Sequence, residues 1–262
     1  MNLDLKNKTA MVCGSTQGIG KASAIELALL GANIVLIARD ESKLISAMKE
    51  LDSTHGQKHN YICVDFQNPN QLKEKAESFI ATKGNVHVLV NNTGGPASGL
   101  IQNAKPEEFL QTFNNHLICN HILMQAVIEG MKKEKYGRII NIISTSVKVP
   151  LKNLGVSNTI RAAVANWSKT LATEVASFGI TVNNVLPGAT LTNRLQGIME
   201  NKSKNTGVEL DKIKNEMLKE IPMLRFAEAS EVANVVAFLS SPAAGYITGI
   251  NIPVDGGRTG CL

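Results

Sequence analysis

The chain has 262 residues, of which 44% are hydrophobic and 19% charged, with a formal net charge of +5. This composition is ordinary for a soluble globular protein that buries a sizeable core. No apolar run approaches the ~18 residues needed to span a bilayer, so we expect no membrane-spanning helix. The first residues do not resemble a signal peptide, so we expect a cytoplasmic protein. Lysines alternate with acids along the chain, which argues against a nucleic-acid surface.

The four cysteines are widely scattered and form no C-x-x-C pair. This spacing is typical of neither a disulfide framework nor a zinc site, so we predict no bound metal. Cys13 and Cys63 lie in apolar runs with strand character, where we expect buried thiols.

Short apolar, β-branched runs alternate with longer stretches of helical period. The predicted strands are Thr9–Cys13, Asn33–Ala38, Tyr61–Val64, Val86–Asn91, Arg138–Ser144, Thr181–Leu186 and Ile250–Val254. The predicted helices are Ile19–Leu30, Glu41–Leu51, Asn70–Thr82, Pro106–Lys133, Arg161–Phe178 and Ser230–Ser240. This order predicts a doubly wound α/β fold with a mostly parallel, seven-stranded Rossmann-type sheet and helices on both faces. We expect residues 1–262 to form a single dinucleotide-binding domain.

One polar, Lys- and Asn-rich segment, Ala189–Leu224, interrupts this alternation between a strand and the last helix. It is too long for an ordinary connection. We interpret it as a lid or flexible loop over the site, with a tolerated surface insertion as the alternative.

A glycine-rich loop joins the first strand to the first helix. It reads Gly14, Ser15, Thr16, Gln17, Gly18, Ile19, Gly20. Gly14 allows the tight turn, Gly18 lets the backbone approach a pyrophosphate, and Gly20 lets the helix pack close to the strand. The phosphates would then meet free N–H groups and the positive end of the helix dipole. Because a strand precedes the loop and a helix follows it, the pattern predicts a dinucleotide site.

The residues after the second strand bear on the choice of cofactor. An NAD site usually places Asp or Glu at the strand end to bond the ribose 2′-hydroxyl. That place holds Ala38, followed by Arg39, whose guanidinium can pair with a 2′-phosphate. NADP(H) is therefore favoured. Two alternatives remain: Asp40 caps the next helix and Arg39 is merely exposed, or Asp40 bonds the ribose in a shifted register and favours NAD(H).

Further motifs follow in order: Asp65 after the third strand, Asn91–Gly94 after the fourth, Pro187-Gly188 with Thr192, then Tyr246–Gly249 and Val254–Gly257. With the glycine loop, they resemble the short-chain dehydrogenase/reductase family, broadly its 3-oxoacyl-carrier-protein reductase-like members. The resemblance implies that hydride passes between a nicotinamide and a carbonyl or alcohol. It implies further cofactor contacts at Asp65, Phe66, Asn92, Gly94, Arg161, Pro187, Gly188, Thr190 and Thr192.

The resemblance also implies four catalytic positions: a serine, a tyrosine, a lysine four residues after it, and an asparagine on an earlier helix. Ser144 stands where the family's serine belongs. Ser157 stands at the tyrosine position, Arg161 at the lysine position and His116 at the asparagine position. The chain is therefore expected to be a divergent member.

The replaced tyrosine changes the proton chemistry. Tyrosine ionises near pH ~10 and an aliphatic hydroxyl at much higher pH, a gap worth roughly 8 kcal/mol, so Ser157 cannot replace tyrosine as a tuned acid. Ser157 can still pass a proton in a concerted relay. Arg161 can keep the ribose bonds and the positive charge. The candidate proton sources are His116, then Lys148, then a water held by Ser144 and Ser157. The alternatives are an interior, hydrogen-bonded His116, a solvent-facing Lys148, and a Ser144 that only satisfies the strand end.

The sequence thus predicts an NADP(H)-dependent oxidoreductase acting on a ketone or secondary alcohol, with a 3-oxoacyl thioester as one substrate class. The alternative is a dinucleotide-binding sensor or structural protein with impaired catalysis. The substrate would be a small molecule or a carrier-bound acyl chain, held by the loops Gly94–Gly99 and Val147–Leu154 and by Ala189–Leu224. The resemblance implies a homotetramer, or a homodimer, paired through Pro106–Lys133, Arg161–Phe178 and the last strand.

Overall fold

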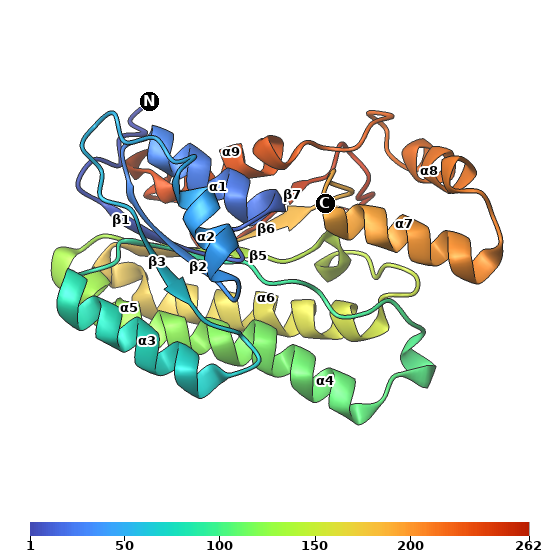
Figure 1. Ribbon diagram of the computed structural model, residues 1–262, viewed down its shortest axis with the longest axis horizontal. Helices are drawn as coiled ribbons and strands as arrows, with labels where there is room; N and C mark the ends of the chain where they lie inside the picture. Colours follow the sequence, from blue (N-terminus) through green and yellow to red (C-terminus); the bar gives the residue numbers. More distant parts are fainter. Residues whose placement is uncertain (262) are drawn as a thin grey trace.

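The computed structural model describes residues 1–261 and contains one parallel sheet of seven strands (Figure 1). Its strand order is β3-β2-β1-β4-β5-β6-β7. The strands are β1 Thr9–Cys13, β2 Asn33–Ala38, β3 Asn60–Cys63, β4 Val88–Asn91, β5 Gly137–Ile142, β6 Ile180–Pro187 and β7 Asn251–Val254. This order confirms the predicted doubly wound fold.

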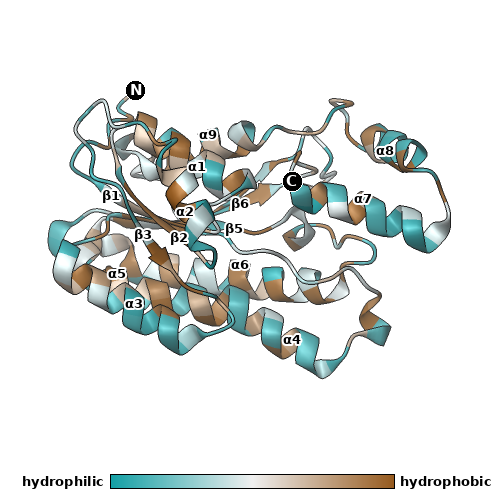
Figure 2. Cartoon of the chain, in the orientation of Figure 1, coloured by the Kyte–Doolittle hydropathy of each residue, from teal (hydrophilic) through white to brown (hydrophobic). Residues whose placement is uncertain are grey.

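Helices cover both faces of the sheet. They are α1 Gly18–Leu29, α2 Glu41–Met48, α3 Pro69–Lys83, α4 Pro106–Phe113, α5 Cys119–Glu134, α6 Gly155–Val175, α7 Asn193–Thr206, α8 Leu210–Lys219 and α9 Ala229–Ser240. One core cluster joins α1, α2 and α9 to the sheet, and a second joins α3, α5 and α6 to its other face. Figure 2 shows the apolar strands between helices whose outer faces are hydrophilic. Every helix within residues 1–261 is too short or too polar to cross a membrane.

The order of the strands reverses at β1, and this reversal places the site. β1 pairs on one side with β2, through Cys13 and Ile37, and on the other with β4, through Val12 and Val90. The connections leaving β1 and β4 therefore run to opposite faces of the sheet. In such sheets a crevice opens beyond the carboxyl ends of the two strands, and ligands bind there.

Most helix ends lie within one residue of the sequence prediction, α2 ends three residues earlier than predicted, and two larger differences bear on the site. The predicted helix Pro106–Lys133 is interrupted by a π-helical turn at Asn114–Ile118, which separates α4 from α5. Helix α6 begins at Gly155, so the predicted start at Arg161 was wrong. A Cβ at Gly155 would lie 2.5 Å from Cβ of Ile101, so only glycine fits this packed start. As a result, the polar residues before Arg161 lie on the helix rather than on a loop.

The segment Ala189–Leu224 contains two helices, α7 and α8, where the sequence suggested a lid or flexible loop. They share a small apolar cluster formed by Leu195, Met199, Ile213, Ile221 and Phe226. At its base, Leu191 N–H donates to the Ala227 carbonyl at 2.8 Å and Ala227 N–H to the Ala189 carbonyl at 2.9 Å. The segment is thus a compact unit that leaves and rejoins the sheet at one point, apart from the two helical layers (Figure 1).

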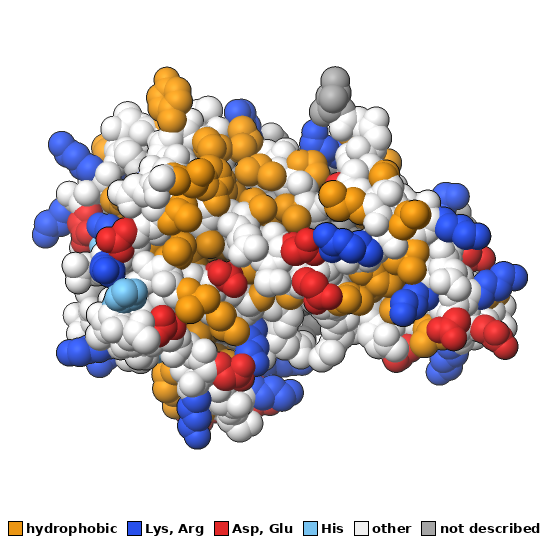
Figure 3. Space-filling model, turned by 90° about the horizontal axis from the view of Figure 1, so that it is seen from above, with side chains coloured by type: hydrophobic (Ala, Val, Ile, Leu, Met, Phe, Trp, Pro, Cys, Tyr) orange, Lys and Arg blue, Asp and Glu red, His pale blue; other side chains and the backbone are white. Residues whose placement is uncertain are grey.

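The surface seen from above in Figure 3 mixes charges of both signs. Lysine and arginine side chains alternate with acids at the end of the molecule that carries α7 and α8. Lys202 and Glu216, for example, pair at 3.5 Å between these helices. This face shows no single basic stripe of the kind that binds nucleic acid.

Candidate active site

The glycine loop adopts the geometry that a phosphate cradle needs. Gly14 and Gly18 have φ values of +58° and +55°, in the left-handed region that favours glycine. A Cβ at Gly20 would lie 2.3 Å from the Gly14 carbonyl oxygen, so the first turn of α1 packs directly against the loop. Gln17 caps α1 without a side-chain hydrogen bond, which leaves the N–H groups of the first turn for a ligand.

Neighbouring residues hold the loop in place. The Asn92 amide donates to the carbonyls of Cys13 at 3.3 Å and Gly14 at 3.4 Å. Ser15 is fully buried, and its hydroxyl donates to the Ile37 carbonyl at 3.4 Å. These contacts tie the loop to β4 and β2. Within the same loop, Thr16 and Ile19 are partly buried, and Gln17 accepts a 3.2 Å hydrogen bond from Asn193.

The adenosine end of the crevice lies beyond β2 and β3. Arg39 Nη1 is 3.9 Å from Asp65 Oδ2, and the Arg39 side chain is 73% exposed. Asp40 caps α2, since its carboxylate accepts the Lys43 N–H at 3.1 Å and the Ser42 hydroxyl at 2.7 Å. Hydrogen bonds from Ser42 and then from the Lys43 backbone lower the Asp40 pKa. Arg39 is thus the free group at this end, while Asp40 serves its helix.

Phe66 and the segment after β6 complete the predicted cofactor contacts. Phe66 packs partly against the core and accepts a hydrogen bond from the Cys119 thiol at 3.3 Å. After Pro187, Gly188 N–H donates to the Val254 carbonyl at 2.9 Å, and the buried Thr190 hydroxyl donates to the Gly188 carbonyl at 3.2 Å. Thr192 caps α7, and a Cβ at Gly18 would lie 3.2 Å from its methyl group. The segment after β6 therefore folds back against the glycine loop.

Ser144 follows β5 and begins a short helical turn, Thr145–Val147. Its Oγ accepts the Ser146 N–H at 3.1 Å. This bond satisfies a backbone N–H just after β5, as expected if Ser144 only serves the strand end. It uses only an acceptor position of the hydroxyl. The hydroxyl hydrogen stays available to a substrate oxygen, so the two roles of Ser144 are compatible.

Arg161 lies on α6 and is only 9% exposed. Its guanidinium donates to the Ile142 carbonyl at 2.9 Å and to the Thr93 carbonyl at 3.4 Å, at the ends of β5 and β4. Burial, followed by the nearby charge of Arg194, lowers its pKa to about 10, so it keeps its charge at neutral pH. Ser157 lies one turn earlier on α6, and residues four apart share a helix face. The partly buried Ser157 thus lies on the same face as a fixed cation.

His116 lies in the π-helical turn and is 2% exposed. Its Nδ1 is 2.5 Å from the Thr93 hydroxyl oxygen. Burial, then the charge of Arg161, lowers its pKa well below the usual value. The sequence favours His116 as the first proton source because histidine ordinarily has a pKa near ~6.5. The lowered pKa removes that reason. The structure therefore agrees with the alternative interpretation, in which His116 is an interior residue with a neutral, hydrogen-bonded imidazole.

Two residues of the site were missed by sequence reasoning. Thr93 is the third residue of the Asn91–Gly94 segment, which resembles an N-N-A-G motif of the family with alanine at this place. Its hydroxyl hydrogen-bonds to His116, and its carbonyl accepts a hydrogen bond from Arg161. Arg194 is the one arginine of Ala189–Leu224, and its Nη2 donates to the Pro96 carbonyl at 2.5 Å. Two signals could have identified them: the departure from the alanine, and an arginine in a lysine-rich segment.

Two of the predicted substrate loops, Gly94–Gly99 and Val147–Leu154, contact each other. Gly99 N–H donates to the Asn153 carbonyl at 2.8 Å, and Gly155 N–H to the Gly99 carbonyl at 3.3 Å. A cavity of about 160 Å³ lies between the Gly94–Gly99 loop and the starts of α4 and α6. Lys148 ends the Thr145–Val147 turn, and its backbone N–H donates to the Thr145 carbonyl at 2.9 Å. Among the hydrogen bonds and ion pairs of residues 1–261, none engages its ammonium group.

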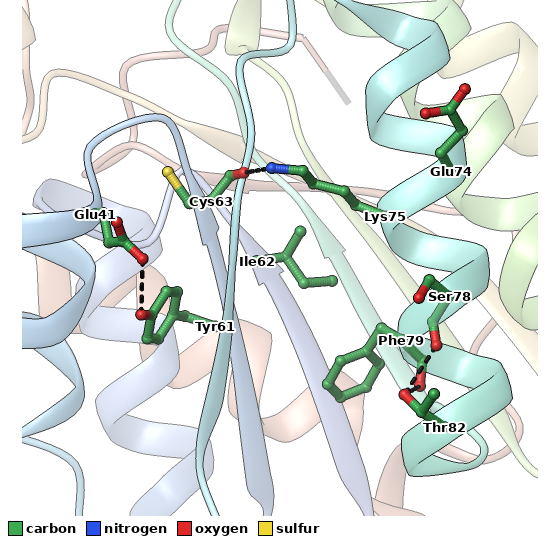
Figure 4. A pocket seen from close by; sticks show the side chains of 9 residues that line it. All are labelled: Glu41, Tyr61, Ile62, Cys63, Glu74, Lys75, Ser78, Phe79 and Thr82. Atoms are coloured by element: carbon green, nitrogen blue, oxygen red, sulfur yellow. Dashed lines mark hydrogen bonds between the residues drawn. The ribbon is translucent and has the colours of Figure 1, made fainter.

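A larger groove, of about 530 Å³, lies along the edge strand β3 between α2 and α3 (Figure 4). Tyr61 donates to Glu41 at 2.9 Å, and Lys75 donates to the free edge carbonyl of Cys63 at 2.6 Å. These side chains satisfy and shield the strand edge. None of the predicted site residues lines this groove. Over the described part of the chain, no group of three or more His, Cys, Asp or Glu side chains could hold a metal ion.

Known proteins resemble this chain over nearly its whole length. The family model described as enoyl-(acyl carrier protein) reductase matches residues 14–259. The 3-oxoacyl-[acyl-carrier-protein] reductase FabG of Vibrio cholerae is 34% identical, over 97% of this chain and 98% of its own. The NADPH-dependent reductase BacG of Bacillus subtilis is 31% identical over the same shares. L-sorbose reductase of Gluconobacter frateurii, solved with NADPH and L-sorbose, superposes with a TM-score of 0.93 at 32% identity, with both chains fully covered. The chain therefore belongs to the short-chain dehydrogenase/reductase family.

Proposed function

We propose that this protein is an NADP(H)-dependent reductase that transfers hydride to a ketone. The observation that carries the proposal is the position of Asn92 and Thr93 at the end of β4. The Asn92 side chain holds the glycine loop, and the carbonyl of the next residue, Thr93, accepts a hydrogen bond from Arg161. The cradle for the pyrophosphate and the buried cation of the catalytic cluster are thus joined through adjacent residues.

The residues present fit a phosphorylated dinucleotide. The N–H groups at the start of α1 would hold the pyrophosphate, in a cradle that a Cβ at Gly14 or Gly20 would fill. Arg39 would pair with the 2′-phosphate, and Arg161 would hold the nicotinamide ribose. Asp65, Gly94, Pro187, Gly188, Thr190 and Thr192 complete the proposed contacts. When bound, the reduced nicotinamide supplies the hydride.

The chain's own groups then act on the substrate oxygen. The Ser144 hydroxyl donates a hydrogen bond to the carbonyl oxygen, while its own acceptor position stays occupied by Ser146 N–H. As hydride adds to the carbonyl carbon, the electron pair moves to oxygen, and the fixed charge of Arg161 stabilises the developing alkoxide. The proton reaches this oxygen through a water held between Ser144 and Ser157, and that water takes a replacement proton from bulk solvent as it gives up its own. We prefer this relay because His116 is neutral and buried.

We also propose that α7 and α8 form a lid over the bound reactants. Thr192, at the start of α7, lies against the glycine loop, and Arg194, on its first turn, reaches the Gly94–Gly99 loop. Movement of this unit about its base at Ala189 and Ala227 would open and close the crevice. Closing a lid excludes water and completes a site that would otherwise be exposed.

The proposed substrate class is a 3-oxoacyl thioester or a smaller ketone, as the names of the relatives suggest. The proposed assembly is a homotetramer or homodimer that covers exposed apolar side chains such as Leu110 and Phe113 on α4. Light scattering after gel filtration measures the assembly, and a monomer would overturn that part of the proposal.

The test of the function is steady-state NADPH oxidation with a panel of 3-oxoacyl thioesters and simple ketones. We expect turnover with at least one class, and a large loss in the Ser144→Ala variant. Tight NADPH binding without turnover on any ketone would favour the alternative, a dinucleotide sensor. Absence of binding to both NADPH and NADH would overturn the proposal as a whole.

A further inference from the structure

We propose that the substrate carries a carboxylate and that Arg194 binds it. This inference rests on the proposed reductase function and adds to it the chemical class of the substrate. It assigns Arg194 the role of a specificity-determining residue, with Arg161 contributing positive charge from behind.

The first argument is the charge of the cluster. Arg161, Arg194 and His116 lie close enough that the charge of Arg194 lowers the pKa of both other groups. Ion pairs within residues 1–261 include neither Arg161 nor Arg194. Two other arginines behave differently, since Arg225 pairs with Glu231 and Arg258 with Glu220. The positive charge of the site is thus uncompensated by these ion pairs, and at the buried Arg161 this is costly unless a ligand brings an anion nearby.

The second argument is the hydrogen bonding of Arg194. A guanidinium has five N–H donors. Arg194 uses one of its terminal nitrogens on the Pro96 carbonyl. The buried Arg138 provides a contrast, because it donates to the carbonyls of Gly137, Gly179 and Ser241 and lies over the Tyr136 ring. Arg138 is satisfied by the fold itself, whereas Arg194 retains donors for a planar, bidentate acceptor such as a carboxylate.

The third argument is position. Arg194 extends from the first turn of α7 to the Gly94–Gly99 loop, so it spans two of the predicted substrate walls. A Cβ at Gly95 would lie 3.3 Å from Arg194 Nη2, so the loop leaves room for the guanidinium. Thr93, two residues earlier, bonds His116 and Arg161. A substrate whose carbonyl reaches Ser144 can therefore place a nearby carboxylate against Arg194.

Such a contact would also serve the chemistry. The site lacks a tyrosine at the position where the family resemblance expects one, and Ser157 is a weak acid. Binding energy from a group remote from the reacting carbon can orient the carbonyl and offset part of that loss. The ribose that Arg161 is proposed to bind carries no charge. The positive charge of Arg161 would therefore stay uncompensated and attract an anionic substrate.

The experiment compares a series of 3-oxo acids with their methyl esters at saturating NADPH. We expect the wild type to prefer an acid over its ester. Arg194→Gln should lower kcat/KM for that acid by about 10- to 100-fold more than for its ester, since only the acid loses a hydrogen bond to a charged group, while any change in the contact with Pro96 affects both. Arg194→Lys, which keeps the charge, should fall between the two. Arg225→Gln is the matched control, because it removes one exposed arginine outside the site.

A parallel readout separates this inference from the proposed function. Calorimetry of the acids and esters with the enzyme–NADPH complex measures carboxylate binding without turnover. Acid binding that Arg194→Gln weakens, in an enzyme that reduces no ketone, would support the inference while the reductase proposal fails. A wild type that binds no acid better than its ester would overturn it. So would an Arg194→Gln variant that keeps the acid preference but binds NADPH more weakly, because Arg194 would then bind the cofactor pyrophosphate.

Discussion

Replacing Arg39 with alanine should weaken binding of NADPH and leave binding of NADH unchanged. The Arg39 side chain is 73% exposed, and its nearest acid is Asp65 at 3.9 Å, so the guanidinium is free to meet a 2′-phosphate. Hydrogen bonds to charged groups contribute ~1.5–3 kcal/mol, and exposure to solvent places this one at the lower end. About 1.5 kcal/mol corresponds to roughly a tenfold higher Kd for NADPH.

Fluorescence titrations with NADPH and NADH measure the two dissociation constants side by side. Asp65→Asn is an informative partner variant. Loss of the proposed Asp65 contact should affect both cofactors alike, whereas removing a negative charge from beside the 2′-phosphate should raise the preference for NADPH over NADH. The effect of Arg39→Ala on NADPH should shrink at high salt, where exposed charges are screened. If Arg39→Ala weakens NADPH and NADH equally, Arg39 does not recognise the 2′-phosphate and the reasoning is refuted.

Three further predictions concern the site. Gly20→Ala places a Cβ 2.3 Å from the Gly14 carbonyl oxygen, so it should lower the free energy of unfolding in urea by about 1–3 kcal/mol. It should also weaken NADPH binding measured by calorimetry. Gly197→Ala on α7 is the control and should do neither, because a Cβ there meets no atom within 4 Å. Ser144→Ala should lower kcat/KM by roughly 100-fold in steady-state assays at unchanged NADPH affinity, and a loss in affinity alone would contradict its role. Burial lowers the His116 pKa in the folded state, so its stabilising effect is present above pH ~6.5 and is lost as the pH falls, by up to ~1.4 kcal/mol per unit. Urea unfolding across pH should show this slope in the wild type and a smaller one in His116→Gln.

The strands were predictable because burial leaves a plain signal in the sequence. β1 and β2 begin and end where the apolar, β-branched runs do, and the remaining strands deviate by a residue or two. β1, β2 and β4 are buried along nearly their whole length, so their runs are almost continuously hydrophobic. The glycine loop was equally legible, because its conformation and close packing require glycine at fixed spacing.

The helices and the site were less predictable for specific reasons. Apolar periodicity continues through Asn114–Ile118, so nothing local marks the π-helical turn that carries His116. The start of α6 depends on the contact of Gly155 with Ile101, which is distant in the sequence. The pKa of His116 is set by burial and by arginines on two other elements. Arg194 enters the site only through the placement of α7, and the polar sequence of that helix resembles a loop.

The paired hydrogen bonds between Ala189, Leu191 and Ala227 have an evolutionary consequence. They bring together the two ends of the segment that carries α7 and α8. The length and sequence of this segment can therefore change without altering the register between β6 and β7. Lengthening a loop whose ends are already joined costs little conformational entropy. Descendants of this chain can therefore trade or reshape α7 and α8, and with them the choice of substrate, while inheriting the nucleotide-binding framework intact.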